Sequence, residues 1–145
     1  SGKTIVLTTT NGTHAINMSR GAHKIVIGSF LNLAALCDWL KTQPNDVLLL
    51  CSGWKDKVNL EDTLFAGGVV HYLREENYAL DDAGIASEDL YIMAKDDLNT
   101  YLKKTSHSER LKKLGIEEDI KFCLNLNITK GIPVLDGERL VKMII

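Results

Sequence analysis

A short run of hydroxyl and amide side chains, TTTNGT, lies between the first apolar segment of the chain and a helix-compatible one. Hydroxyl groups, an amide and the backbone N–H groups beside a glycine can together bind a phosphate or sulfonate, above all at the start of a helix. A simple Asn-Gly turn, with Thr13 as the helix N-cap, would use the same residues. The candidate anion-binding residues, called here the threonine elbow, are Thr9, Thr10, Asn11, Gly12 and Thr13.

Two adjacent carboxylates, Glu61 and Asp62, stand where another helix is predicted to begin, with Asn59 as its N-cap. Mg²⁺ prefers oxygen ligands, and one or two carboxylates with water and substrate phosphate can complete its octahedron. The same two side chains would also stabilise the positive end of the helix dipole. The pair therefore predicts either a magnesium site or an ordinary helix start.

A third polar segment, TSHSERLKK, places His107 between two serines and shortly before Arg110. Either serine could cap a helix there, and the guanidinium could reach an anion. A solvent-exposed helix start accounts for the same letters. His71, in the helix that follows Asp62, is expected to be a packed residue rather than a ligand.

The three cysteines, Cys37, Cys51 and Cys123, share no CxxC spacing and sit in apolar contexts. Such thiols are expected to be reduced, buried and inert. A phosphatase loop of the Cys-x5-Arg kind is excluded, because the matching position after Cys51 is Lys57.

Composition limits the classes of partner. The formal net charge of the 145 residues is −2, which argues against a general binder of nucleic acid or of anionic membrane surfaces. No apolar stretch approaches the roughly 18 residues of a membrane span. The sequence therefore predicts one soluble, cytoplasmic domain over residues 1–145.

The elements that would position these residues alternate along the chain. Three short runs rich in Val, Ile and Leu are typical of strands covered on both faces. Helical segments lie between and after them, and Asp136-Gly137 marks the turn of a terminal hairpin. The expected fold is α/β, a layered α/β/α arrangement with a central, mostly parallel or mixed sheet and a C-terminal hairpin. The predicted strands are 3–9, 23–29 and 46–52.

Two consecutive glycines, Gly67 and Gly68, fall inside the long helix predicted from Asn59. Each would cost a helix roughly 1 kcal/mol relative to alanine. We therefore expect another part of the chain to approach the backbone closely at this point.

Taken in order, several segments resemble the 2-phosphosulfolactate phosphatase family over nearly the whole chain. They are GKTIVLTTTNGTHAI, IGSFLNLAAL, DVLLLCSGWKDKVNLED, AGGVVHYL, SHSERLKKLGIEEDIKFCLNLN and IPVL. The resemblance implies a Mg²⁺-dependent phosphatase that converts (R)-2-phospho-3-sulfolactate to 3-sulfolactate and phosphate, a step toward coenzyme M. It also implies a layered α/β fold outside the common phosphatase superfamilies.

Carried over to this sequence, the resemblance assigns the threonine elbow to the anionic groups of the substrate. Glu61 and Asp62 become the metal-binding acidic pair, and Asp62 and His107 become candidate catalytic residues, with Ser106 near the pocket. The partner implied is a small phosphorylated anion, with no nucleic acid and no membrane.

Two departures from the family pattern stand out. Family members exceed two hundred residues and carry a DVLRATTT-like strand and a GGER loop, which this sequence lacks. We therefore expect the chain to be the C-terminal part of a longer phosphatase, as a homodimer or associated with the N-terminal portion. His14 stands where the family has arginine after NGT, and imidazole is a weaker anion clamp than guanidinium. The alternatives to an enzyme are a non-catalytic anion-binding fragment and a structural half of the longer protein.

Overall fold

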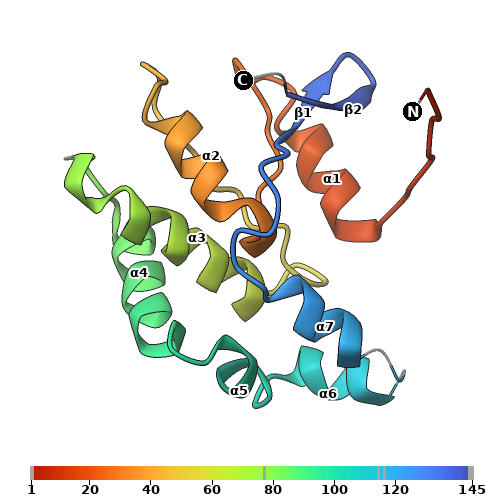
Figure 1. Cartoon of the computed structure of the whole chain (residues 1–145), viewed down its shortest axis with the longest axis vertical. Coiled ribbons are helices and arrows are strands. Elements are labelled where there is room, and N and C mark those ends of the chain that lie inside the picture. Colours follow the sequence, from red (N-terminus) through yellow and green to blue (C-terminus); the bar gives the residue numbers. More distant parts are fainter. Residues whose placement is uncertain (1, 77, 114, 116, 144–145) are drawn as a thin grey trace.

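The computed structural model of the chain describes residues 2–76, 78–113, 115 and 117–143. Its elements are shown in Figure 1 and combine many helices with a small antiparallel hairpin. In chain order they are α1 (Thr10–Met18), η1 (Phe30–Asn32), α2 (Leu33–Leu40), α3 (Leu60–Tyr72), η2 (Arg74–Glu76), α4 (Asp82–Ala94), α5 (Leu98–Leu102), α6 (Ser106–Lys113), α7 (Glu117–Cys123), β1 (Pro133–Asp136) and β2 (Arg139–Lys142).

The core lies among α2, α3 and α4, with contributions from α5 and from the segment before β1 (Figure 1). Leu33 and Leu64 are fully buried, and Ile132 closes the core from the side of the hairpin. Three helices between 79 and 115 agree with the predicted two or three. None of the described helices is long and apolar enough to cross a membrane.

The close approach predicted at the glycine pair is confirmed. A Cβ built on Gly67 would lie 1.9 Å from the carbonyl oxygen of Ser87, so the backbones of α3 and α4 touch here. A Cβ on Gly68 would lie 3.2 Å from the ring of Tyr91, closer than most Cβ contacts, so the ring would have to move by a few tenths of an ångström. The glycine pair thus places α4 against the second half of α3.

The C-terminal hairpin is confirmed, with Val134 paired to Val141 and Asp136 paired to Arg139. The turn is therefore Gly137-Glu138, one residue later than predicted, and Gly137 adopts φ +56°. Part of the predicted strand 23–29 lies against this hairpin. The N–H of Ile27 donates to the Pro133 carbonyl at 2.9 Å, and Val26 forms an antiparallel bridge with Val134.

The other two predicted strands do not form a sheet among the described residues. Segments 3–9 and 46–52 carry no strand assignment. Most of their apolar side chains face solvent, with exposed fractions of 91% for Val6 and 85% for Leu48, and Leu49 packs partly against the core. A strand needs a hydrogen-bonding neighbour and cover on its apolar faces, and the described residues supply no strand partner and little cover for these two segments. The fold therefore mixes helix and strand as expected, and the described residues do not show the predicted central sheet.

Candidate functional site

The threonine elbow forms the start of α1. Thr9, in extended conformation, is the N-cap, and its hydroxyl oxygen accepts the N–H of Thr13 at 3.2 Å. The Thr13 hydroxyl oxygen accepts the N–H of Thr9 at the same distance. The cap is thus reciprocal, and the alternative with Thr13 as N-cap is wrong because the helix begins four residues earlier than that alternative required.

The same geometry explains the glycine of the elbow. A Cβ on Gly12 would lie 2.9 Å from the Thr9 hydroxyl oxygen, so a larger residue would push the capping side chain aside. The first turn contains no acidic residue, and the Thr10 side chain is exposed. Because a helix start leaves N–H groups without intrahelical acceptors, those of Thr10, Asn11 and Gly12 can face an anion.

An ion pair holds the far end of α1 against the hairpin. The Arg20 guanidinium contacts both carboxylate oxygens of Glu138 at 2.9 Å. A bidentate contact of this kind fixes direction as well as distance. Figure 1 shows α1 beside β1 and β2 accordingly.

The predicted acidic pair lies in the first turn of α3, and Asn59 is its N-cap, as predicted. The Asn59 side-chain oxygen accepts the N–H of Glu61 at 3.0 Å. Asp62 Oδ2 accepts the N–H of Gly53 at 2.8 Å and the Ser52 hydroxyl at 3.2 Å. Asp62 therefore ties the preceding loop to the helix, and its Oδ1 takes no part in these two bonds.

Trp54 connects this loop to α6. The Arg110 guanidinium carbon lies 3.7 Å from the Trp54 ring centroid, a cation–π contact, and Lys55 lies 5.8 Å from the same ring. The segment that carries His107 thus packs beside the acidic corner, the region of Ser52 to Asp62. The His107 and Ser106 side chains lie outside the described residues.

The cysteines are free, as predicted, although only Cys37 is buried. Burial, with the nearby Asp38 charge, raises the pKa of Cys37 to about 12. Partial burial raises the pKa of Cys51, and the Asp62 carboxylate adds to this. The expectation of burial is wrong for Cys51 and Cys123, which are exposed.

The donor set limits how a metal could bind. Within the described part of the chain, no group of three or more His, Cys, Asp or Glu side chains could hold a metal ion. Glu61 and Asp62 supply two carboxylates, which suffice for Mg²⁺ only where water and phosphate provide its remaining oxygens. They do not match a site built wholly from protein ligands, such as a structural zinc site.

Comparison with protein families decides the relationship. The family described as 2-phosphosulpholactate phosphatase matches residues 1–138 of the chain. The chain belongs to this family. The resemblance found in the sequence is therefore confirmed.

Curated relatives within the 2-phosphosulpholactate phosphatase family are named probable 2-phosphosulfolactate phosphatases. The one from Thermotoga petrophila is 42% identical over 135 residues, which are 93% of this chain and 58% of the relative. That from Caldanaerobacter subterraneus is 35% identical over 92% of this chain and 56% of its own length. That from Synechocystis is 36% identical over 92% and 57%. The chain thus spans less than three fifths of the length of these relatives.

Of the residues predicted for the site, the structure places Asp62 and the segment of Arg110 in one region, and it adds Ser52 and Trp54 to them. Asp62 and the loop before α3 form one corner, and α6 lies against it through Arg110. The sequence did not predict that Ser52 would donate a hydrogen bond to Asp62 or that the Trp54 ring would contact Arg110. A tryptophan among lysines in SGWKDK, just before a capped helix, is the signal that could have indicated them.

Proposed function

We propose that the protein is a phosphatase that acts on a small phosphomonoester, with (R)-2-phospho-3-sulfolactate as its substrate and 3-sulfolactate and phosphate as products. The observation that carries this proposal is the family match over residues 1–138, which includes every candidate site residue. The relatives' printed name supplies the substrate. The reaction would be a cytoplasmic step toward coenzyme M.

The elbow would bind an anionic group of the substrate. The N–H groups in the first turn of α1 and the Asn11 amide are donors that a phosphate or sulfonate oxygen accepts. Thr9 and Thr13 are engaged in the cap and would act by holding the turn in shape. In this assignment the backbone donors supply the binding, and the hydroxyls position them.

The acidic corner would hold Mg²⁺ through Glu61 and Asp62. The ion would neutralise charge on the phosphate oxygens, as magnesium does in other phosphoryl transfers. Ser52 and Gly53 keep the Asp62 carboxylate in one orientation, and Trp54 keeps the Arg110 guanidinium beside the corner. His107 stays a candidate catalytic residue.

The test is release of inorganic phosphate. The 145-residue chain and the product of the complete coding sequence are incubated with phosphosulfolactate and a panel of phosphomonoesters, with Mg²⁺ and with EDTA. We expect Mg²⁺-dependent release from phosphosulfolactate in the complete product. If neither protein releases phosphate from any of these substrates, the protein is not a phosphatase, and an anion-binding or structural role is favoured. Phosphate release that continues in EDTA would show that the reaction does not require Mg²⁺.

We also propose that segments 3–9 and 46–52 are strands of a central mixed sheet in the longer protein, of which this chain would be the C-terminal part. Support comes from their exposed apolar side chains and from the relatives' greater length. The 145-residue chain should then self-associate through this apolar surface.

Sedimentation velocity tests this expectation. Val6→Lys and Leu48→Lys together should shift the chain toward monomer, whereas Met93→Lys, at an exposed position on α4, should not. A chain that is monomeric at high micromolar concentration without any substitution would contradict the proposal.

A further inference from the structure

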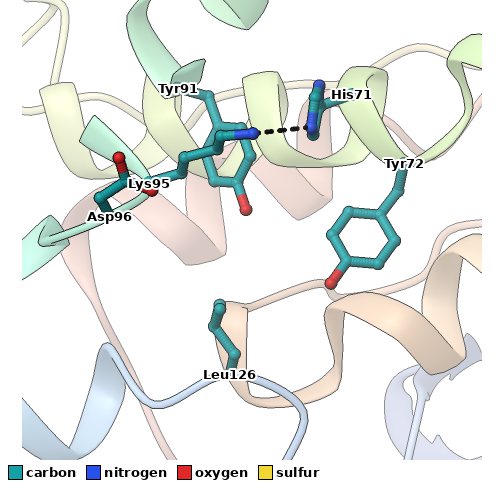
Figure 2. A pocket seen from close by; sticks show the side chains of 6 residues that line it. All are labelled: His71, Tyr72, Tyr91, Lys95, Asp96 and Leu126. Atoms are coloured by element: carbon teal, nitrogen blue, oxygen red, sulfur yellow. Dashed lines mark hydrogen bonds between the residues drawn. The ribbon is translucent and has the colours of Figure 1, made fainter. Parts of the chain in front are cut away.

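A second candidate ligand site lies at the C-terminal ends of α3 and α4. It is an open pocket of about 480 Å³ (Figure 2). The pocket is shallow and open to solvent, so a ligand bound there would stay partly exposed. The lining residues are His71, Tyr72, Tyr91, Lys95, Asp96 and Leu126. His71 follows Glu61 by ten residues on the same helix, about 15 Å along its axis, so the pocket is separate from the acidic corner.

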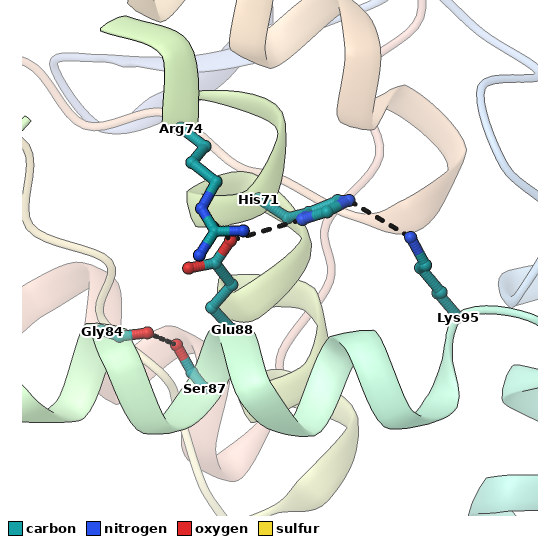
Figure 3. Close-up of polar contacts among 6 residues, drawn as sticks. All are labelled: His71, Arg74, Gly84, Ser87, Glu88 and Lys95. Carbon is teal, nitrogen blue, oxygen red and sulfur yellow. Dashed lines mark hydrogen bonds and ion pairs between the residues drawn. The ribbon is translucent and has the colours of Figure 1, made fainter. Parts of the chain in front are cut away.

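A chain of polar contacts leads into this pocket (Figure 3). The Glu88 carboxylate is buried, and its Oε1 lies 3.3 Å from His71 Nδ1 and 3.4 Å from Arg74 Nε. A carboxylate can only accept, so the tautomer that satisfies both ring contacts carries its proton on Nδ1 and leaves Nε2 as an acceptor. The Lys95 ammonium lies 3.5 Å from that Nε2.

This arrangement holds a cation at the pocket. His71 occupies one hydrogen of the Lys95 ammonium, and an ammonium has three. Arg74 already offsets the charge of Glu88, so the lysine is not needed as its counter-ion. The lysine is therefore positioned by His71, and its other two hydrogens can be donated to a ligand.

Two phenols add further hydrogen-bond donors. The hydroxyls of Tyr72 and Tyr91 both point toward the side where Leu126 lies (Figure 2). Burial raises the pKa of Tyr91, with smaller effects from Tyr72 and Cys37, so its hydroxyl stays protonated at neutral pH. The ring of Tyr91 packs at 5.5 Å from that of His71, which limits movement of both.

We propose that this pocket binds a small organic anion that also carries a hydrogen-bond donor, such as a hydroxy- or amino-carboxylate. Lys95 and the two phenols would contact the anionic group. Asp96, on the opposite side of the lysine, would accept from the ligand's hydroxyl or ammonium group. The nearby Asp96 charge disfavours compact dianions, which distinguishes this pocket from the threonine elbow. The proposal does not depend on phosphatase activity.

The test is an NMR titration of the ¹⁵N-labelled 145-residue chain with sodium glycolate and sodium acetate, at constant ionic strength set with NaCl. Glycolate should shift amides in residues 91–96, and it should bind more tightly than acetate because only glycolate offers a hydroxyl to Asp96. Lys95→Gln should raise the glycolate Kd about 10-fold or more, since a hydrogen bond to a charged group is lost. Lys103→Gln, an exposed lysine outside the pocket, is the matched control.

Equal Kd values for Lys95→Gln and the unsubstituted chain would overturn the proposal, as would shifts confined to residues 10–13. Asn11→Ala separates this site from the elbow. It should leave the shifts in residues 91–96 unchanged, whatever it does to phosphate binding. Loss of those shifts in Asn11→Ala would also count against a separate pocket.

Discussion

Gly67→Ala is expected to destabilise the protein by about 3 kcal/mol, the top of the range typical of overpacking a well-packed core. The added Cβ would lie 1.9 Å from the Ser87 carbonyl oxygen and 2.5 Å from its carbon. Both are backbone atoms of α4, so no side-chain rotation relieves the clash and the two helices must separate. Alanine gains only about 1 kcal/mol of helix propensity over glycine, which does not offset that cost. A fall in Tm of roughly 10 °C should be seen by circular dichroism or calorimetry.

Gly68→Ala is the matched control, because it makes the same chemical change one residue along the same helix. Its Cβ would meet side-chain atoms of Tyr91 and Leu33 at 3.2 and 3.4 Å, and these can shift slightly. We expect a change within about 1 kcal/mol, since the helix-propensity gain is of that size. An equal loss of stability in both variants would show that helix contact at Gly67 is not the cause.

The glycine pair also shows what a sequence can predict and where local information ends. Two glycines in a strong helical pattern indicated a close approach, and the approach was found. The sequence could not identify Ser87 as the neighbour, because that depends on how the chain returns after η2. The caps behave in the same way. Asn59 was predicted as the cap of α3, since capping involves only neighbouring residues.

Sheet formation depends on more than local pattern. The sequence predicted a central sheet of three strands, and the described residues show the C-terminal hairpin with one short bridge to segment 23–29. The runs at 3–9, 23–29 and 46–52 have similar composition. Among the residues that the structure describes, only the middle one pairs with a strand, at β1, more than one hundred residues away. The other two have the pattern of buried strands, but the described part of the chain gives them no strand to pair with and covers few of their side chains, Leu49 among them. An apolar run therefore predicts that a segment needs to be buried. It does not predict which other part of the chain, if any, covers that segment.

For the candidate site, too, the sequence predicted local features and not the contacts between distant parts of the chain. The helix start at Glu61-Asp62, with Asn59 as its cap, was predicted from local sequence, whereas the N-cap at the elbow was placed at Thr13, four residues after the true cap at Thr9. The loop fold that delivers Gly53 and Ser52 to Asp62, and the contact of Arg110 with Trp54, are tertiary results that spacing alone does not encode. Glu88 behind His71 was missed for the same reason, because the two residues meet only once α4 packs on α3.

Asp62→Asn is expected to lower phosphate release from phosphosulfolactate by about 100-fold or more. Residues that only hydrogen-bond to a metal ligand typically cost about 10–100-fold when substituted, and a direct ligand should cost more. The substitution keeps an oxygen that can accept the Gly53 N–H and the Ser52 hydroxyl, so the loop should stay anchored. It removes the negative charge that a magnesium ion would require. The measurement is the steady-state rate over a range of Mg²⁺ concentrations in the product of the complete coding sequence.

Cys51 provides a second readout that does not depend on turnover. The Asp62 charge helps to raise the pKa of the Cys51 thiol, so its removal should lower that pKa and increase the thiolate fraction near pH 8. Alkylation of Cys51 by iodoacetamide should then be faster in Asp62→Asn, while Cys37, with a pKa near 12, stays unmodified. Asp56→Asn, an exposed aspartate of the same loop, is the control and should change neither activity nor alkylation. Faster alkylation with undiminished activity would confirm the electrostatic contact and exclude Asp62 from catalysis.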